Sequence, residues 1–362
     1  MSLTLLGIVV VVGSFLVSVA GVCIVRKLSV RAGFVSRPAE DRFGDSIVPL
    51  GGGVAIFVTI AIFLLGGAAI VKFLIAPGVL GFLNESVTVH AEGFLAKIPD
   101  LLVVVGAAFV LHITGLYDDK KHLGPFVKLF IQFAAAFCAA GLADVRVEFF
   151  IENRMITTAL SAFWIVLIIN AFNFLDNMDG LSAGIATIIS AALLAAAVVS
   201  GQFFVSAMAL VVIGALLGFL VFNFPPAKIF MGDGGSMVVG FFVALLSLRT
   251  TYYHEAIGGG FYAVFMPIIV MAVPLYDFIS VTILRISQGK SPFVGDTQHF
   301  SHRLKRRGLS DRQVALTLYL ATICTCLGGV VLYQVSLAGA ILVLVQTVLI
   351  LIIIAILEMT AK

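Results

Sequence analysis

The sequence predicts an all-α, polytopic integral membrane helix bundle. Of its 362 residues, 61% are hydrophobic and only 11% are charged, and the mean hydropathy is +1.17. A soluble domain carries about 25% charged residues, so too few polar side chains remain here to coat one buried core. Apolar runs of roughly 18–22 residues recur along most of the chain, and each can cross a hydrocarbon layer about 30 Å thick as a helix. These observations exclude soluble, disordered, collagen-like and small disulfide-bonded proteins.

About eleven apolar segments are candidate transmembrane helices, or ten if the eighth and shortest is not counted. In chain order their approximate limits are residues 3–25, 50–72, 99–116, 126–143, 157–175, 181–200, 203–222, 235–250, 259–284, 314–333 and 337–357. The first has no basic residue before its apolar stretch, and Arg26, Lys27 and Arg31 follow it. This order is the reverse of a cleavable signal peptide and predicts a retained span. Residues 73–98 are expected to form a longer loop outside.

The basic residues favour one orientation, with the N-terminus outside and the C-terminus in the cytoplasm. The inside segments are then about 26–49, 117–125, 176–180, 223–234, 285–313 and the C-terminus. With the adjoining span ends, they hold 17 of the 22 Lys and Arg residues. The outside regions hold only Lys72, Lys97, Arg146, Arg154 and Arg249. We therefore expect a single transmembrane domain over residues 1–362, with its functional loops on the cytoplasmic face.

The first motif closes the third span, with the sequence Gly-Leu-Tyr-Asp-Asp-Lys-Lys. Its adjacent carboxylates, Asp118 and Asp119, repel each other and lose hydration at a membrane edge unless a cation or a proton relieves them. This pattern suits a catalytic acidic pair, one member of which accepts a proton or supports a metal ion. The alternative is a solvated helix end that Lys120 and Lys121 neutralise.

The second motif closes the fifth span, and its polar residues Asn170, Asn173, Asp176 and Asp179 recur at every third position. Such a row drifts about 60° per step around a helix, so its later members are expected to line a helix end that opens into a loop at Gly180. Asn side chains donate and accept, whereas ionised Asp only accepts. The mixture suits a hard cation or a polar ligand such as a nucleotide base. Polar contacts between helices explain one or two such residues, not four.

The third motif, residues 222–236, reads Phe-Asn-Phe-Pro-Pro-Ala-Lys-Ile-Phe-Met-Gly-Asp-Gly-Gly-Ser. Its glycines allow the backbone to approach a ligand closely. Asp233 is expected at the N-terminus of the next helix, where backbone amides also favour anions. A carboxylate beside a phosphate implies a bridging divalent cation, most simply Mg²⁺, and Phe230 can stack on a base. The structural alternative makes Asp233 a helix N-cap.

The fourth motif lies in the last inside loop, the most basic part of the chain. His299, His302 and Arg303 fit phosphate or sugar recognition better than a zinc site, because no third metal ligand accompanies the two histidines. The run at 305–307 also suits a basic patch that holds lipid headgroups. One acid, Asp277, lies well inside a span, where we expect a bundle-facing hydrogen-bonding residue.

Together the four motifs resemble the polyprenyl-phosphate N-acetylhexosamine-1-phosphate transferases (glycosyltransferase family 4), which are integral membrane enzymes of cell-envelope and glycan synthesis. The resemblance rests on Gly-Leu-Tyr-Asp118-Asp119, Asn170-Ala-Phe-Asn173-Phe-Leu-Asp176-x-x-Asp179-Gly-Leu, Phe230-Met-Gly-Asp233-x-Gly-Ser and His299-x-x-His302-Arg303. It covers nearly the whole chain, in order. It implies that a UDP-N-acetylhexosamine and undecaprenyl phosphate react with Mg²⁺ or Mn²⁺ to give undecaprenyl-diphospho-N-acetylhexosamine and UMP, at the bacterial cytoplasmic (inner) membrane.

The resemblance also implies roles by motif position. Asp233 and Asn173 would hold the metal ion, and Asp118 would deprotonate the lipid phosphate with support from Asp119. The residues that would lie at the nucleotide are Asp176, Asp179, Asn223 and Phe230. The residues that would bind phosphate and sugar are Lys128, His299, His302 and Arg303. Direct in-line attack is the preferred mechanism, and a covalent intermediate on Asp118 remains an alternative.

Within the family, the basic loop resembles the branch that transfers GlcNAc-1-phosphate and starts teichoic acid or lipopolysaccharide O-antigen synthesis. The branch that uses UDP-MurNAc-pentapeptide has a three-histidine run that is missing here, and Ser301 stands where the middle histidine of the usual His-x-His-His is expected, so the sugar stays open. The competing classes are a secondary transporter, which needs ionisable groups near mid-membrane, and a non-catalytic lipid-binding or nucleotide-binding membrane protein. We expect membrane lipids as partners and no nucleic acid, with a homodimer as one option.

Overall fold

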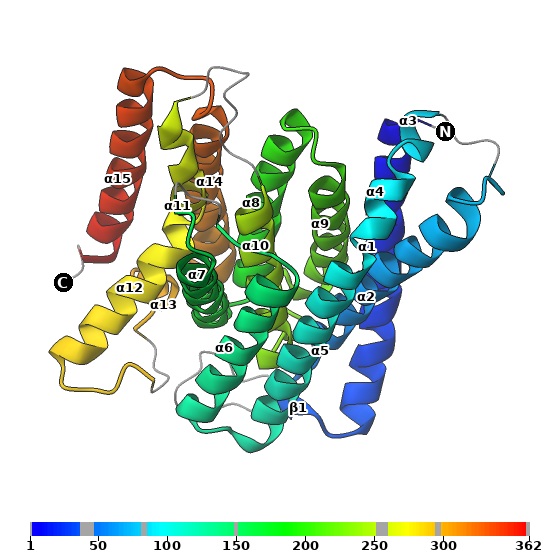
Figure 1. Cartoon of the computed structure of the whole chain (residues 1–362). Coiled ribbons are helices and arrows are strands. Elements are labelled where there is room, and N and C mark those ends of the chain that lie inside the picture. The colour runs from blue at the N-terminus through cyan, green and yellow to red at the C-terminus, as the bar shows by residue number, and fades with distance from the viewer. Residues whose placement is uncertain are drawn as a thin grey trace.

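The computed structural model describes residues 2–36, 47–80, 85–147, 151–250, 260–293 and 298–359. Within these residues the chain is an α-helical bundle (Figure 1), and the only strands are β1 (Val35–Ser36) and β2 (Val48–Pro49), which pair antiparallel with Val35 opposite Pro49. The predicted all-α class is confirmed. Parts of two predicted inside segments, 37–46 and 294–297, lie outside the described residues.

The helices differ in length and follow the predicted segments closely. In chain order they are α1 (Leu3–Arg31), α2 (Gly52–Ile70), the π-helix η1 (Val71–Ile75), α3 (Glu85–Thr88), α4 (Ala91–Ala96), α5 (Ile98–Lys121), α6 (Pro125–Leu142), α7 (Arg154–Leu175), α8 (Leu181–Val199), α9 (Phe203–Asn223), α10 (Asp233–Arg249), the 3₁₀-helix η3 (Phe261–Phe265), α11 (Met266–Val270), α12 (Ala272–Ser287), α13 (Phe300–Arg306), α14 (Asp311–Val331) and α15 (Leu337–Met359). The expected outside loop at 73–98 is corrected, because it contains the short helices α3 and α4.

The described part of the chain has nine helices that are long and apolar enough to cross a membrane, which makes it a multi-pass membrane protein. These nine are α1, α2 continued by η1, α5, α6, α7, α8, α9, α14 and α15. The ninth predicted span is broken: Phe261–Val270 and Ala272–Ser287 meet at an angle of 63°, and they make a tenth span if they are counted as one. The eighth predicted span, α10, has 17 residues and falls outside this set.

Although short, α10 runs from one end of the bundle to the other. At its first residue, Asp233, it contacts the end of α5 and the start of α6. At its last residue, Arg249 donates a hydrogen bond to the carbonyl of Asp144, which follows α6. Residues 234–247 are all buried, and α10 packs against α2, α5, α7 and α8. Because protein surrounds α10, its length does not have to match the hydrocarbon layer.

Two glycines allow the helices to approach each other closely where α10 begins. A side chain on Gly115 of α5 would collide with the backbone of Asp233 and Gly234, and one on Gly53 of α2 would collide with the backbone of Gly235. The close packing of α2 and α5 against α10 therefore depends on residues without a Cβ atom. It brings the Asp-Asp motif next to the Gly-Asp-Gly-Gly motif.

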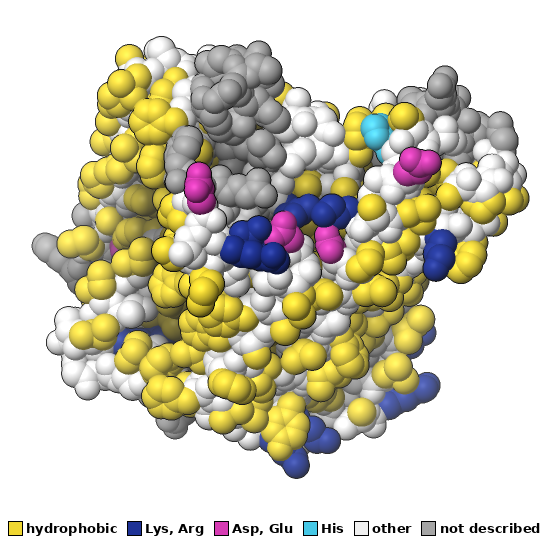
Figure 2. All heavy atoms as spheres, viewed as in Figure 1, with side chains coloured by type: hydrophobic (Ala, Val, Ile, Leu, Met, Phe, Trp, Pro, Cys, Tyr) yellow, Lys and Arg dark blue, Asp and Glu magenta, His cyan; other side chains and the backbone are white. Residues whose placement is uncertain are grey.

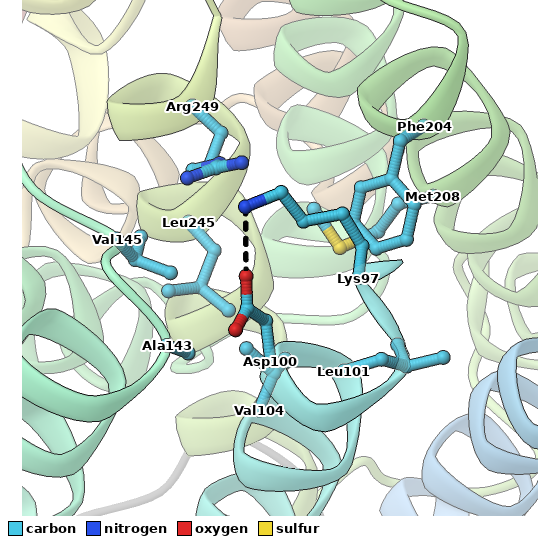
Figure 3. Close-up of a pocket in the computed structure, with 10 residues that line it drawn as sticks. All are labelled: Lys97, Asp100, Leu101, Val104, Ala143, Val145, Phe204, Met208, Leu245 and Arg249. Atoms are coloured by element: carbon cyan, nitrogen blue, oxygen red, sulfur yellow. Dashed lines mark hydrogen bonds and ion pairs between the residues drawn. The ribbon is translucent and has the colours of Figure 1, made fainter. Parts of the chain in front are cut away.

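Figure 2 shows charged side chains in a band across the middle of the view and along its lower edge, with apolar side chains between the two groups. The end at the bottom of Figure 1 holds the predicted functional motifs. At the opposite end, five charged residues form what we call the distal cluster: Lys97, Asp100, Asp144, Arg146 and Arg249. Three of them border a cavity of about 20 Å³ whose other walls are mostly apolar (Figure 3).

Candidate active site

Three helices bring carboxylates and one lysine together at the lower end of the bundle. Asp118 and Asp119 lie in the last turn of α5, Lys128 lies in the first turn of α6, and Asp233 is the first residue of α10. The Nζ atom of Lys128 lies 3.0 Å from Oδ2 of Asp118 and also contacts Oδ2 of Asp233. We call these four residues the acidic cluster. Its three carboxylates face one cation from the protein.

Asp119 caps the start of α10 from a different helix. Its two carboxylate oxygens accept hydrogen bonds from the backbone N–H groups of Asp233, at 2.9 Å, and Gly234, at 3.3 Å. The first N–H groups of a helix have no partner within the helix and favour a negative charge. The interpretation of Asp233 as the N-cap is therefore wrong: Gly232 occupies that backbone position, and Asp119 supplies the carboxylate. This leaves the Asp233 side chain free to face Lys128.

Asp118 is held by contacts on both of its oxygens. Oδ1 accepts a hydrogen bond of 2.5 Å from the backbone N–H of Leu123, and Oδ2 pairs with Lys128. Only 13% of the Asp118 side chain is exposed, so the acidic pair is not a solvated helix end. Its neighbouring cation is Lys128, ten residues further along the chain, whereas Lys121 lies over the ring of Tyr117.

The second motif meets the acidic cluster through Asn173. The side-chain amide of Asn173 donates to Oγ of Ser236 on α10 at 2.9 Å, and it also contacts the Asp233 carboxylate. Asn170, one turn earlier, donates to Gln132 of α6 at 2.7 Å and is thus a polar contact between helices. The expected helix end is confirmed: α7 ends at Leu175.

Two loops beside the acidic cluster are tied together by the predicted nucleotide residues. Asn223 accepts from the backbone N–H of Gly180 at 3.0 Å and donates to the carbonyl of Ile229 at 2.9 Å. Asp179 accepts from the N–H of Ala227 at 2.8 Å, and burial raises the pKa of this carboxyl. Both polar ends of the Asn223 amide are thus used within the protein, and this residue joins the two loops.

Phe230 continues this loop toward the second helix. Its side chain is half-buried, and its backbone N–H donates to Pro49 while its carbonyl accepts from Gly52, each at 2.9 Å. The start of α2 therefore fixes the path of the loop that carries the predicted base-stacking ring. Asp176 caps the end of α7 on the neighbouring loop.

The basic motif starts at α13 and is anchored by Asp277 of α12. This fully buried carboxylate accepts from Nδ1 of His299 at 2.8 Å and from the backbone N–H of Phe300 at 3.0 Å. A hydrogen bond on Nδ1 fixes the ring and leaves Nε2 as the second functional atom. The expectation of a hydrogen-bonding residue at Asp277 is confirmed, and the structure adds its partner.

Ser301 links the same short helix to the loop after α7. It is fully buried, and its hydroxyl donates to Oδ1 of Asn177 at 2.5 Å. His302 is also buried, and desolvation lowers the pKa of this imidazole to about 4, which keeps it neutral at pH 7. Arg303 instead contacts Ser280 of α12 and Glu358 of α15. Among the described residues, none of its polar contacts is with the acidic cluster.

Several residues that shape this site were missed by sequence reasoning. Nδ1 of His112 lies 2.7 Å from the carbonyl of Gly234, and its ring stacks on Phe57. Asn177 and Glu358 contact the basic motif. His112 and Glu358 are polar residues within otherwise apolar runs, which is a signal the sequence does carry.

The acidic cluster offers oxygen atoms to a metal ion but no complete set of ligands. Within the described residues, no group of three or more His, Cys, Asp or Glu side chains surrounds one point. The Asn173 side chain donates a hydrogen bond to the Asp233 carboxylate, and each of these two side chains carries hard oxygen atoms that could bind a cation. Mg²⁺ is commonly bound by one or two carboxylates together with waters and substrate phosphates. The donor set therefore fits Mg²⁺ or Mn²⁺.

Comparison with known proteins agrees with this arrangement. The sequence profile of glycosyl transferase family 4 matches residues 101–251. A protein of Bacillus subtilis, named probable undecaprenyl-phosphate N-acetylglucosaminyl 1-phosphate transferase, is 31% identical over 334 residues that cover 89% of this chain and 85% of that protein. A decaprenyl-phosphate N-acetylglucosaminephosphotransferase of Mycobacterium tuberculosis is also 31% identical, over 82% of this chain and 75% of its own length. An undecaprenyl-phosphate alpha-N-acetylglucosaminyl 1-phosphate transferase of Yersinia pestis is 25% identical, over 88% and 82%.

The matched segment contains the Asp-Asp motif, the polar row of the fifth span and the Gly-Asp-Gly-Gly motif. The relatives extend the similarity across most of the chain. These findings set the transporter alternative aside. The chain belongs to glycosyl transferase family 4, on the branch of the polyprenyl-phosphate N-acetylglucosamine-1-phosphate transferases.

Proposed function

We propose that this enzyme transfers GlcNAc-1-phosphate from UDP-GlcNAc to undecaprenyl phosphate, releasing UMP. The observation that carries the proposal is the acidic cluster, in which three carboxylates and one lysine from α5, α6 and α10 meet at one end of a membrane bundle. Such a site suits a reaction in which one phosphorylated substrate is a lipid and the other is a water-soluble nucleotide sugar. The names of the relatives support the polyprenyl phosphate and the GlcNAc-1-phosphate group.

In this reaction an oxygen of the lipid phosphate attacks the β-phosphorus of UDP-GlcNAc. The bond between that phosphorus and the bridging oxygen breaks, and UMP leaves with both electrons of the bond. Asp118 takes the proton of the lipid phosphate, and Lys128 offsets the repulsion between the two anionic reactants. Asp119 holds the start of α10 so that Asp233 keeps its place.

Asp233 and Asn173 are the residues that would hold Mg²⁺ or Mn²⁺. When bound, such a cation neutralises charge that develops on the transferring phosphate. The present contact of Lys128 with Asp233 supports a site that attracts a cation. The Lys128 ammonium group and the metal ion would then both contact the Asp233 carboxylate.

The nucleotide would bind beside the loops 176–180 and 223–234. Asp179 and Asn223 join these loops, and Phe230 offers a half-buried ring for uracil. The sugar and diphosphate would then meet α13, which carries His299, His302 and Arg303. Neutral His302 would donate a hydrogen bond to the sugar rather than supply charge.

We place the acidic cluster at the cytoplasmic face of the bacterial inner membrane. Most basic residues of the chain belong to the ends and loops on this side, and cytoplasmic loops are enriched in Lys and Arg. Dark blue side chains along the lower edge of Figure 2 agree with that distribution. The product would then start a cell-envelope polysaccharide such as teichoic acid or lipopolysaccharide O-antigen.

The second candidate donor is UDP-MurNAc-pentapeptide. Ser301 stands where the family usually has a histidine, and its buried hydroxyl holds α13 against the loop after α7, so this residue leaves the sugar open. The names of the relatives favour GlcNAc.

The decisive experiment incubates the purified enzyme with undecaprenyl phosphate, Mg²⁺ and several radiolabelled UDP-sugars in parallel. We expect label from UDP-GlcNAc in a solvent-extractable lipid and equimolar release of UMP. Release of UDP would identify an ordinary glycosyltransferase and contradict the proposal, and label from UDP-MurNAc-pentapeptide alone would replace the donor.

A further inference from the structure

The last helix carries one buried acid at an unexpected place. Most of α15 is apolar and much of its surface is exposed, as suits a helix that faces lipid. Glu358, one residue before its end, is nevertheless only 7% exposed. A carboxylate is buried in this way only when it has partners that compensate for lost hydration. The identity of those partners indicates what Glu358 does.

All three partners of Glu358 lie in or beside the basic motif. The hydroxyl of Tyr276 on α12 donates to Oε1 at 2.5 Å, and Nη2 of Arg303 lies 3.1 Å from Oε2. The guanidinium of Arg307 donates to the backbone carbonyl of Glu358, with Nε at 3.2 Å. The end of α15 is thus fastened both to α12 and to the short helix α13 and the residue that follows it.

Arg303 is held through its Nη2 atom and has a donor without a partner at Nε. Its Nη2 atom also donates to Oγ of Ser280 at 3.1 Å, so Ser280 and Glu358 both hold the same end of the guanidinium. Its Nε–H is buried and has no acceptor within the described residues. A buried donor without a partner is costly and rare, and a planar guanidinium held in this way suits an anionic ligand.

We propose that Glu358 is a positioning residue that holds Arg303 for the diphosphate of the sugar nucleotide. The proposal rests on the proposed function, in which Arg303 contacts the donor substrate. Glu358 touches no substrate itself. Its carboxylate fixes the guanidinium at Nη2, so that less side-chain freedom is lost when the donor binds.

The chain offers a matched control on the same short helix. Lys305 of α13 pairs with Asp311 of α14 at 2.7 Å, and both side chains are about one-third exposed. Asp311→Asn removes an ion pair between α13 and another helix, as Glu358→Gln does, but it leaves Arg303 and its partners in place. A general loosening of α13 would affect both variants, whereas positioning of Arg303 depends on Glu358 alone.

The experiment measures steady-state transfer by the full-length enzyme in detergent or nanodiscs, with UDP-GlcNAc and undecaprenyl phosphate varied in turn. We expect Glu358→Gln to raise the KM for UDP-GlcNAc about tenfold while the KM for undecaprenyl phosphate stays unchanged. Asp311→Asn should leave both values within about twofold. Arg303→Gln should raise the donor KM as well, and Glu358→Gln should add nothing further in the Arg303→Gln background, because both changes remove one function.

A second variant keeps the test valid if Glu358→Gln does not fold. Tyr276→Phe retains both charges and removes only the hydroxyl that orients Glu358, and it should raise the donor KM about threefold. Equal effects of Glu358→Gln and Asp311→Asn, or multiplying effects of Glu358→Gln and Arg303→Gln, would overturn the positioning role. An unchanged donor KM in Arg303→Gln would overturn it too, while the transferase activity stands. Absence of transfer by the wild-type enzyme would instead refute the proposed function, and the role of Glu358 with it.

Discussion

The two ends of the bundle use the same kinds of charged side chain in opposite proportions. In the distal cluster, Lys97 pairs with Asp100 at 3.0 Å and Arg146 pairs with Asp144 at 2.6 Å, so each carboxylate has its own cation. Arg249 adds a further positive charge there, and Figure 3 shows its guanidinium close to the Lys97–Asp100 pair. In the acidic cluster the proportion is reversed, because three carboxylates share one lysine.

This difference distinguishes ion pairs that support the fold from charged side chains that are arranged to bind a ligand. In the distal cluster each carboxylate is neutralised by its own Lys or Arg side chain, so no further ion is needed there. In the acidic cluster, backbone N–H groups stabilise Asp118 and Asp119, while the Asp233 side chain meets only Lys128 and neighbouring polar groups. A local excess of half-buried carboxylates favours the binding of a cation. Substitutions at the two ends should therefore have different effects, and the following experiments test that difference.

The largest effect is expected at Asp233. Replacing it with Ala removes the carboxylate that would hold the metal ion, and transfer should fall by about 1,000-fold or more. The protein should still fold, because the Asp233 backbone N–H, rather than its side chain, makes the contact with Asp119. Lipid labelling measures activity and gel filtration measures folding. Substantial residual turnover would refute Asp233 as a metal ligand.

A somewhat smaller loss of activity is expected from Asp119→Ala, together with a loss of stability. This change removes the cap of α10, which typically contributes about 0.5–2 kcal/mol, and it allows Asp233 to move. We expect transfer to drop about 100-fold and the melting temperature to decrease. Asp119→Asn, which retains one acceptor oxygen, should lose less of both. If Asp119→Ala melted like the wild type, the capping role would be wrong.

The third effect is the dependence of the free energy of unfolding on pH, and it arises at His302. Its folded pKa of about 4 lies below the ordinary value of 6.5, so the unfolded chain binds the extra proton first as the pH falls. The contribution of His302 is therefore fully present above about pH 6.5 and is lost as the pH falls toward 4, by up to about 3 kcal/mol. Thermal or denaturant unfolding at pH 7 and pH 4.5 measures this loss. The His302→Gln variant should lose less over the same interval, and an equal loss in both proteins would contradict the assignment.

The smallest effect is expected in the distal cluster. Asp100→Asn breaks a partly exposed ion pair with Lys97, so the free energy of unfolding should change by less than about 1 kcal/mol. Transfer should stay within about twofold of the wild type, because Asp100 precedes Asp118 on α5 by 18 residues, which is about 27 Å along the helix. A loss of activity comparable to that of Asp119→Ala would show that the two ends are coupled.

Sequence reasoning located the elements of this fold better than it paired them. Long apolar runs are a local property, so helices were found at all eleven predicted segments, and the end of α7 before Gly180 was anticipated correctly. The short helices α3 and α4 carry too few residues to show a period, and they were taken for a loop.

Hydrogen bonds and ion pairs were harder to predict than helices, because they join residues that lie far apart in the chain. Asp119 caps a helix that starts 114 residues later, and the assignment of a cap to Asp233 considered only local sequence. Asp277 was recognised as a hydrogen-bonding residue, but its partners, His299 and Phe300, depend on how the chain returns after α12. No sequence pattern indicates that Glu358 contacts Arg303 of the basic motif.

The enclosed position of α10 has a consequence for biosynthesis. Its neighbours α2, α5 and α7 all precede it in the chain, so the membrane holds them before the helix that fills the space between them has been made. A nascent chain that stops short of residue 233 has inserted the Asp-Asp motif but lacks the third carboxylate and the backbone groups that anchor Asp119. The acidic cluster would therefore form in a single step of assembly, when the glycine-rich start of α10 packs between α2 and α5.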